Sequence, residues 1–193
     1  MLRRTYDWVI DQAEKPWALF TLAAVAFIES SVFPIPPDVM LIPMIIAAPT
    51  RAWLIAAVCT AASVAGGAFG WWIGAEFFDS IGRPVLEFYG KDGKFDELAI
   101  AYNDQGFWAV LIAGVTPFPY KVITIFSGVT GLDFWTFMAT SVLARGLRFF
   151  IVAALLWKFG APIRDFIERR FGLVATVAIA LLIGGFAAAR FLL

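Results

Sequence analysis

Long hydrophobic runs dominate the chain, and polar segments and two proline-rich breaks separate them. The first run, 17–33, meets the break FPIPPD and continues as a second apolar arm at 39–48. As a helix this second arm is about 16 Å long, roughly half of the ~30 Å hydrocarbon core of a membrane. It is therefore too short to cross a bilayer alone, and 51–78 is the first run that is long enough.

The second half of the chain repeats this order. An apolar run at 107–115, about 14 Å long if helical, leads into the break TPFPYK, and runs at 122–132 and 134–159 follow. Both breaks have the pattern Pro-x-Pro-x-charge-Val, with Asp38 in the first and Lys121 in the second. After the first long run comes IGRPVLEF, which resembles FGAPIRDF after the second. Two matches in the same order indicate an internal repeat.

Each break is expected to be the tip of a hairpin that enters and leaves on one side of the membrane. Because one long run crosses between them, the hairpins would enter from opposite faces, as in an inverted-topology repeat. The predicted fold is all-α: a polytopic membrane protein with two re-entrant helical hairpins plus spanning and interfacial amphipathic helices. Two proline-kinked spanning helices without a shared cavity are the alternative. The predicted hairpin breaks are Pro34, Pro36, Pro37, Pro117 and Pro119.

The whole chain, 1–193, is expected to form a single membrane domain. Glycines 66, 70 and 74 repeat every four residues in the first long run, a spacing that lets another helix approach closely. The polar stretches have amphipathic periodicity, which favours helices in the headgroup layer. In order, the predicted segments are an interfacial helix at 1–15, the first repeat at 17–79, an amphipathic connector at 80–105, the second repeat at 106–160, an interfacial segment at 161–170 and a C-terminal spanning helix at 171–193.

Composition narrows the class of protein. Hydrophobic residues make up 61% of the 193 residues and aromatic residues 17%, far more than in an ordinary soluble domain. The net charge is zero, which indicates no nucleic-acid partner. There is no histidine, which excludes Ser-His-Asp triads and HExxH metal sites, and the single cysteine, Cys59, lies in an apolar run. We therefore expect no enzyme, no cofactor and no metal site.

Five charged residues lie within or beside the apolar runs, where each would cost about 2.5–3.5 kcal/mol at a helix centre. They are Glu29 and Asp38 in the first half and Lys121, Arg145 and Arg148 in the second. A pseudo-symmetric fold can bring these acids and bases face to face. Buried ion pairs that only lock the two halves together are one interpretation. The surplus positive charge favours another, an anionic lipid headgroup, because guanidinium groups bind phosphate bidentately.

Several motifs at these residues resemble the DedA family of VTT-domain membrane proteins, and more closely its YqaA-like bacterial branch. They are FIE at 27–29, FPIPPD at 33–38, GVTPFPYK at 114–121, SGVTGLDFWTF at 127–137 and ARGLRFF at 144–150. The resemblance implies re-entrant hairpins, the bacterial inner membrane and lipid movement between leaflets, with proton or sodium coupling as an option. Many members have Arg-x-x-Pro-x-x-Arg in the second hairpin, whereas this chain has Gly114 and Tyr120 in those slots. Arg145 and Arg148 are expected to supply the missing charge.

The expected function is lipid transport by a flippase or scramblase that moves a phosphate-bearing lipid, such as a polyprenyl phosphate or a phospholipid. Arg145, Arg148 and Lys121 are expected to bind the lipid phosphate, and Glu29 and Asp38 to couple transport to H+ or Na+. The sequence leaves the oligomeric state open, and a homodimer is one option. The alternatives are a small-ion or proton-coupled exchanger and a structural membrane protein for envelope assembly. For a structural role, exchanging the charges of Asp38 and Lys121 should keep activity. An excess of basic residues near the N-terminus favours a cytoplasmic N-terminus.

Overall fold

The computed structural model describes residues 17–33, 36–88, 92–116, 118–160 and 162. All regular structure in these ranges is helical and no strand occurs among them, so the all-α prediction is confirmed for this part of the chain. The predicted segments 1–15 and 171–193 lie outside it, as does 161–170 apart from Pro162. In chain order the helices are α2 (Ala18–Ser31), α3 (Asp38–Ala47), the 3-10 helix η1 (Pro49–Arg51), α4 (Ala52–Phe77), the π-helical segment η2 (Phe78–Gly82), α5 (Arg83–Phe88), α6 (Asp92–Asp104), α7 (Gly106–Val115), α8 (Tyr120–Val129) and a last helix, Phe134–Gly160.

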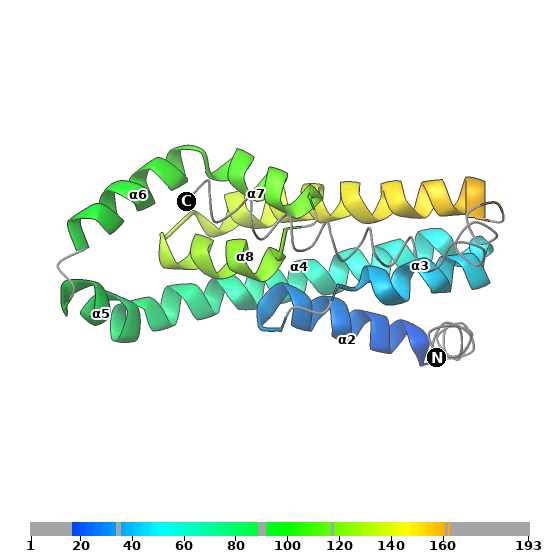
Figure 1. The fold of residues 1–193 in the computed structure, drawn as a ribbon, viewed down its shortest axis with the longest axis horizontal. Coiled ribbons are helices and arrows are strands. Elements are labelled where there is room, and N and C mark those ends of the chain that lie inside the picture. The colour runs from blue at the N-terminus through cyan, green and yellow to red at the C-terminus, as the bar shows by residue number, and fades with distance from the viewer. Residues whose placement is uncertain (1–16, 34–35, 89–91, 117, 161, 163–193) are drawn as a thin grey trace.

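Two helices are long and apolar enough to cross a membrane by length and composition: Pro49–Ser80, which contains α4, and Phe134–Gly160. They match the two long runs in the sequence. Figure 1 shows both extending along the length of the molecule in opposite directions. The shorter apolar helices α2, α3, α7 and α8 have 10 to 14 residues, too few to span a hydrocarbon core of ~30 Å.

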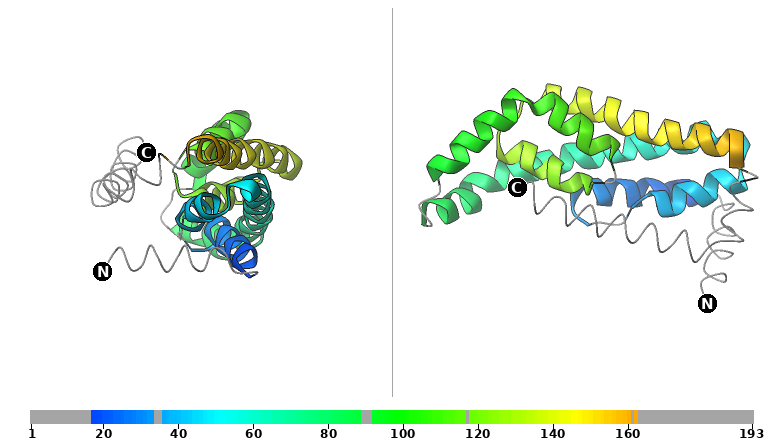
Figure 2. Two further views of the ribbon diagram at one scale, coloured as in Figure 1. Left: turned by 90° about the vertical axis from the view of Figure 1, so that its right-hand side faces the viewer. Right: turned by 45° about the horizontal axis from the view of Figure 1, so that its top comes forward.

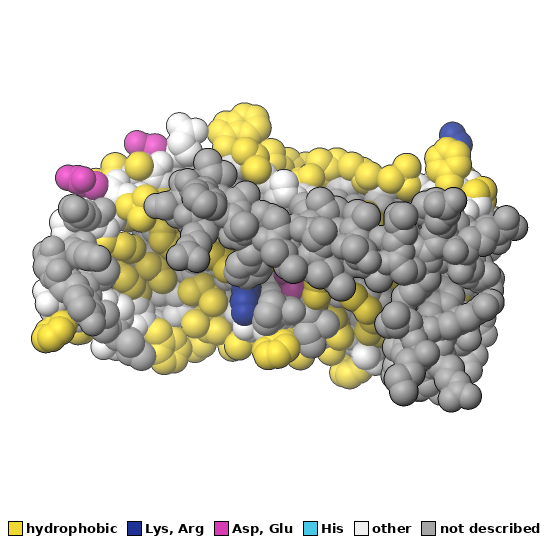
Figure 3. All heavy atoms as spheres, in the orientation of Figure 1, with side chains coloured by type: hydrophobic (Ala, Val, Ile, Leu, Met, Phe, Trp, Pro, Cys, Tyr) yellow, Lys and Arg dark blue, Asp and Glu magenta, His cyan; other side chains and the backbone are white. Residues whose placement is uncertain are grey.

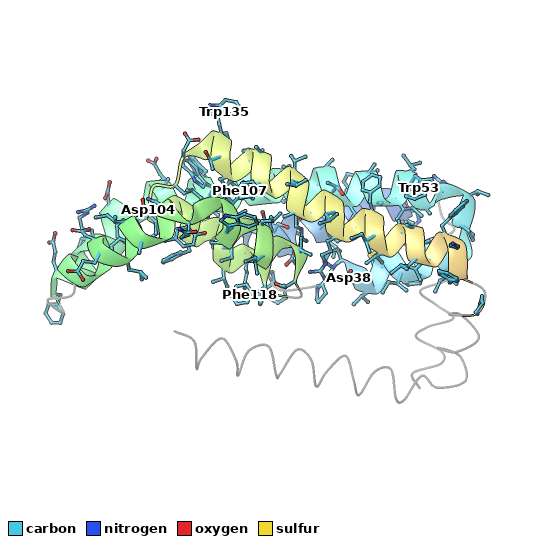
Figure 4. The ribbon with its side chains drawn as sticks, turned by 90° about the horizontal axis from the view of Figure 1, so that it is seen from above. Asp38, Trp53, Asp104, Phe107, Phe118 and Trp135 are labelled. Atoms are coloured by element: carbon cyan, nitrogen blue, oxygen red, sulfur yellow. The ribbon has the colours of Figure 1, made fainter. Side chains whose placement is uncertain are left out.

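The four short helices form two hairpins that approach each other from opposite ends of the molecule (Figures 1 and 2). Helix α2 runs inward from the end where α4 begins and stops about halfway, and α3 returns to that end. Helices α7 and α8 follow the same path from the other end. In Figure 4, Asp38 at the start of α3 and Phe118 just before α8 lie near the middle, whereas Trp53 lies toward the end where α4 begins.

Proline residues separate the two arms of each hairpin, because proline lacks a backbone N–H and disfavours a helical conformation in the residue before it. Helix α2 ends at Ser31, and Pro36 and Pro37 follow before α3 begins. Pro119 directly precedes α8. The predicted break residues outside the described ranges are Pro34 and Pro117.

The glycines of α4 lie where other helices approach its backbone, as their spacing predicted. A Cβ on Gly66 would collide with the Phe27 carbonyl of α2, and a Cβ on Gly74 would collide with the Ile125 carbonyl of α8. Gly70 lies against α8 and close to the end of α2. Helix α4 is therefore the element on which both hairpins pack, and its close contacts require residues without a side chain.

Helix α8 contributes a matching glycine that the sequence analysis did not single out. A Cβ on Gly128 would collide with the Trp71 carbonyl of α4. Just beyond α8, Gly131 has a φ of 68°, a left-handed conformation that suits glycine at the end of a helix. Asp133 then caps the last helix: the Thr136 N–H donates to its Oδ2 at 2.8 Å, which lowers the pKa of this exposed carboxyl.

Two apolar clusters stabilise the bundle. The first combines α2, α3 and the beginning of α4 with the second half of the last helix. The second joins α7 and α8 to the beginning of the last helix through Val110, Tyr120, Leu132 and Phe137. A further set of buried residues is polar and includes Glu29, Ser30, Ser63, Thr124, Ser141 and Arg145. This polar set contributes hydrogen bonds between the two hairpins, as when the Thr124 hydroxyl donates to the Ser30 carbonyl at 2.9 Å.

The connector between the two halves is divided into η2, α5 and α6, a division that the hydrophobic pattern did not predict. Two side chains of α6 attach it to the second hairpin. The Tyr102 hydroxyl is hydrogen-bonded to the Ser127 hydroxyl at 2.8 Å, and the Asn103 amide donates to the Thr130 carbonyl at 2.7 Å. The second hairpin is thus fixed both by α4 and by the connector.

Candidate functional site at the hairpin tips

Glu29, near the end of α2, forms a buried ion pair with Arg145 of the last helix. Glu29 Oε2 lies 2.9 Å from Arg145 Nη2, and the side chains are 9% and 1% exposed. Arg145 Nε also donates to the hydroxyl of Ser63 on α4 at 2.6 Å. An acid of the first half therefore meets a base of the second half, as the charge distribution predicted, and α4 supplies a third partner.

Both carboxylate oxygens of Glu29 accept further hydrogen bonds. The Ser30 hydroxyl donates to Oε2 at 3.1 Å, and the backbone N–H of Tyr120 donates to Oε1 at 3.3 Å. Tyr120 is the first residue of α8, so the carboxylate lies at the positive end of that helix dipole. The buried carboxylate is thus held by the guanidinium, a hydroxyl and a helix N-terminus.

The guanidinium of Arg145 lies near two aromatic rings. Its Cζ lies 4.7 Å from the ring centre of Tyr120 and 4.6 Å from that of Phe149, both within the range of cation–π attraction. These contacts and its hydrogen bonds to Glu29 and Ser63 fix the side chain in place. Phosphate binding by Arg145 stays a prediction, since it would have to give up some of these partners.

Asp38 and Arg148 form the second ion pair, which is partly exposed. Asp38 Oδ2 lies 2.6 Å from Arg148 Nη2, with exposed fractions of 21% and 17%. Arg148 Nη1 donates to the carbonyl of Thr116, directly after α7, at 2.7 Å. One guanidinium therefore bridges the beginning of α3 in the first hairpin and the end of α7 in the second.

Lys121 on α8 makes the other polar contact between the tips on this side. Its Nζ donates to the carbonyl of Val32, directly after α2, at 3.1 Å. In the described part of the chain Lys121 takes part in no ion pair, whereas Asp38 is paired with Arg148. Exchanging the charges of Asp38 and Lys121 would therefore not preserve an ion pair. The test of a structural role has to exchange the charges of Asp38 and Arg148 instead.

Tyr120 and Gly114, which stand in the two arginine slots of the family motif, lie next to each other. A Cβ on Gly114 would be 3.2 Å from Tyr120 Cε2 and too close to the Cβ of Ala144. The ring of Tyr120 is fully buried, and its hydroxyl donates to Ser141 Oγ at 2.6 Å. A neutral aromatic ring thus occupies one slot, and the Arg145 guanidinium lies beside it.

The hydroxyl groups of the site were missed by the sequence reasoning, which followed charges and prolines. They belong to Ser30, Ser63, Thr124 and Ser141, all fully buried. The available signal was a hydroxyl residue inside an apolar run, but such residues also bond to their own helix backbone, as Thr60 does to Ala56 at 2.8 Å. Sequence position alone does not separate these two cases.

Hydrophobic side chains border the partly exposed side of the tips. Those with large exposed fractions include Val32, Phe33, Val39 and Val122. On the described surface in Figure 3, a basic and an acidic side chain lie close together in the middle of a mostly hydrophobic face. This arrangement can hold an anionic group against cations while apolar chains contact the surroundings. Within the described ranges, no group of three or more Cys, Asp or Glu side chains is placed to hold a metal ion.

Comparison with known proteins identifies the family. The family profile described as VTT domain matches residues 35–158. An uncharacterized protein of Haemophilus influenzae is 37% identical over 167 residues, covering 84% of this chain and 86% of the relative. An uncharacterized protein of Histophilus somni is also 37% identical over 167 residues, covering 84% of this chain and 87% of the relative. No solved structure matches. Because the VTT domain is the domain of the DedA family, this chain belongs to the DedA family of membrane proteins.

Proposed function

We propose that the protein is a flippase or scramblase that moves a phosphate-bearing lipid between the leaflets of the bacterial inner membrane. In this proposal α2–α3 and α7–α8 are re-entrant hairpins in an inverted-topology repeat, and their tips meet near the membrane midplane. Membership of a family of membrane proteins supports the location. The observation that carries the proposal is the pair of acid–base contacts, Glu29–Arg145 and Asp38–Arg148, between elements of the two halves.

Exposed tryptophans support a midplane depth for the tips. Trp135 and Trp157 on the last helix are exposed and about 33 Å apart at 1.5 Å per residue, close to the ~30 Å hydrocarbon core. Trp53 and Trp72 on α4 are also exposed, with a spacing of about 28 Å. Tryptophan prefers the two membrane–water interfaces. Arg145 falls midway between Trp135 and Trp157, so interfaces at these two residues place the ion pairs near the bilayer centre.

The charge balance supports a phosphate as the transported headgroup. Glu29 and Asp38 offset two of the three cations, which leaves the charge of Lys121. A lipid phosphate would neutralise it, and both lysine and arginine bind phosphate. Polyprenyl phosphates and phospholipids share this group, and the exposed apolar side chains around the tips suit their chains.

Coupling to H+ or Na+ is assigned first to Asp38. Asp38 is partly exposed and has Arg148 as its ion-pair partner, whereas Glu29 is buried and accepts hydrogen bonds from three donors. Solvent reaches Asp38 more readily than Glu29, and fewer hydrogen bonds hold the Asp38 carboxylate in place. Glu29 would then hold Arg145 and the start of α8 in place throughout transport.

The charges at the two ends of the molecule support a cytoplasmic N-terminus. Arg51 and Lys158 lie at the end from which α2 enters. Arg83 is a described cation near the opposite end, where acids outnumber cations among the side chains that the structure describes. By the positive-inside rule, the end with Arg51 faces the cytoplasm. The described acids toward the opposite end are Glu76, Asp79, Glu87, Asp96, Glu97, Asp104 and Asp133.

The test is lipid movement in vesicles that contain the purified protein and a fluorescent phospholipid or polyprenyl phosphate in one leaflet. We expect Arg148→Ala to lower the transfer rate by about tenfold or more, because phosphate loses a charge-assisted partner. Asp79→Ala is the control, since Asp79 forms an exposed pair with Arg83 far from the tips. Equal transfer by Arg148→Ala and wild type would contradict the proposal.

Two further measurements separate the alternatives. Ion flux in vesicles without a phosphate lipid, together with no lipid transfer, would indicate an exchanger. The double variant Asp38→Arg with Arg148→Asp keeps an ion pair between the tips but moves the cation. A transporter that uses Arg148 should lose activity in this variant, whereas a structural protein should keep it.

A further inference from the structure

The two hairpin tips are joined in two different ways. On the buried side, the Tyr120 N–H donates to Glu29 and the Thr124 hydroxyl donates to the Ser30 carbonyl. On the partly exposed side, both donors are cationic side chains. We call this second set the tip bridge: Arg148 with Asp38 and the Thr116 carbonyl, and Lys121 with the Val32 carbonyl.

The tip bridge uses the same cations that the proposed function assigns to the lipid phosphate. All of its acceptors are oxygen atoms, one of a carboxylate and two of main-chain carbonyls that follow α2 and α7. A phosphate carries several anionic oxygens and competes well for a guanidinium and an ammonium group. These contacts engage two of the five N–H groups of Arg148 and one of the three of Lys121. A phosphate therefore competes with Asp38 for the positive charge of Arg148 rather than for every donor, because two anions at one cation repel each other.

From this competition, and on the basis of the proposed function, we propose that phosphate binds to Arg148 and Lys121 in place of Asp38 and thereby separates the partly exposed sides of the hairpin tips. The buried pair Glu29–Arg145 remains closed during this exchange, since it is enclosed by Tyr120 and Phe149. The ligand thus opens the junction in which it binds.

Thermodynamic linkage predicts the direction in which the tip bridge changes the affinity for phosphate. If phosphate binding breaks the tip bridge, then an intact bridge must weaken phosphate binding by the same factor. Asp38→Asn removes the competing charge and leaves Arg148 and Lys121 in place. This variant should bind phosphate more tightly than wild type, by about tenfold, because a hydrogen-bonded charge pair no longer has to be broken. A carboxylate that helped to hold the ligand would give the opposite result.

The experiment measures the distance between spin labels on the two tips. The labels are placed at Val39 of α3 and Val122 of α8, both exposed, in a background in which the buried Cys59 is replaced by Ala. Double electron–electron resonance spectra are recorded in vesicles without ligand and with farnesyl phosphate, inorganic phosphate or farnesol. Farnesol has the same chain without the phosphate and serves as the control ligand.

We expect farnesyl phosphate to lengthen the distance and farnesol to leave it unchanged. A response to farnesyl phosphate alone assigns the site to a lipid headgroup, and an equal response to inorganic phosphate assigns it to free phosphate. Asp38→Asn should show the longer distance without ligand and reach half-maximal binding of farnesyl phosphate at about one tenth of the wild-type concentration. Arg148→Lys, which keeps a cation, should retain part of the response.

Two results would overturn the inference: an unchanged distance with both phosphates in wild type, or weaker binding of farnesyl phosphate to Asp38→Asn. The failure of the proposed function looks different, because the distance would respond to phosphate while no lipid moved between leaflets. Conversely, lipid transfer without any change in distance would leave the transport function standing and remove the tip bridge as its gate.

Discussion

Glu29 and Arg145 are 116 positions apart in the chain, yet their side chains form an ion pair of 2.9 Å that is almost closed to solvent. The pair joins the end of α2 to the middle of the last helix, and Ser63 connects it to α4. Such a pair does not necessarily stabilise a fold compared with apolar residues, but breaking it leaves a buried charge without a partner. This asymmetry makes its role testable.

Removal of one partner should destabilise the protein strongly. We expect Glu29→Ala or Arg145→Ala to lower the free energy of unfolding by about 3–5 kcal/mol, as for other buried pairs. Thermal or denaturant unfolding of the purified protein in detergent measures this change. The double variant Glu29→Gln with Arg145→Met removes both charges and should recover much of the loss.

The matched control for this pair is Asp79→Ala, which breaks the exposed pair with Arg83. Surface pairs contribute little, so no measurable change in unfolding is expected. If Glu29→Ala unfolded at the same midpoint as Asp79→Ala, the buried pair would not be the connection described above.

A methyl group on a glycine of α4 should disturb the fold only where another backbone lies against it. Gly74→Ala places a Cβ against the Ile125 carbonyl and should destabilise the protein by about 1–3 kcal/mol through overcrowding. Gly146→Ala on the last helix is the control, because its nearest neighbour, the Cγ2 of Thr60, would be 3.9 Å away. Unfolding midpoints in detergent compare the two, and equal effects would contradict the close approach of α4 and α8.

Lys121 should affect transport more than stability. The one described hydrogen bond of its side chain is to the Val32 carbonyl, and it takes part in no ion pair among the described residues. Lys121→Met should therefore leave the unfolding midpoint close to that of wild type and lower the rate of lipid transfer in vesicles. Lys121→Arg keeps the charge and should retain most of the rate. A wild-type rate in Lys121→Met would remove this residue from the substrate site.

Tyr120 should stabilise the folded protein through its hydroxyl as well as through its ring. Tyr120→Phe keeps the ring next to Arg145 but leaves the buried Ser141 hydroxyl without its present donor, at a cost of about 1–3 kcal/mol. The double variant Tyr120→Phe with Ser141→Ala removes both groups and should be more stable than Tyr120→Phe alone. Unfolding in detergent tests this order, and additive losses would contradict the coupling.

The course of the chain could be predicted from the sequence to a large extent, because hydrophobic run lengths and prolines determine it. The runs at 51–78 and 134–159 correspond to the two long helices, and the arms beside the breaks correspond to short ones. The apolar run of the second arm begins at 122, whereas α8 begins two residues earlier, at Tyr120. The Tyr120 N–H is accepted by Glu29, a partner from the other half of the chain that local sequence does not reveal.

The partners within the candidate site were harder to predict than its members. That acids of the first half face bases of the second followed from the repeat, but the pairing of Glu29 with Arg145 and Asp38 with Arg148 depends on how each helix is rotated. Arg145 and Arg148 share a helix face by spacing, yet one is buried and the other partly exposed. Burial depends on how the tips pack together, which hydrophobic patterns do not encode.

The most direct test of the account is the depth of the hairpin tips in the bilayer. Fluorescent labels on single cysteines at Val39 and Val122, in the Cys59→Ala background, are compared with labels at the exposed Leu147 in mid-helix and Leu54 beside Trp53. Lipids brominated at different acyl positions quench each label according to its depth. We predict that Val39 and Val122, like Leu147, are quenched most by the deepest bromines. Quenching of both tip labels at the shallow depth of Leu54 would contradict the meeting of two re-entrant hairpins at the membrane midplane.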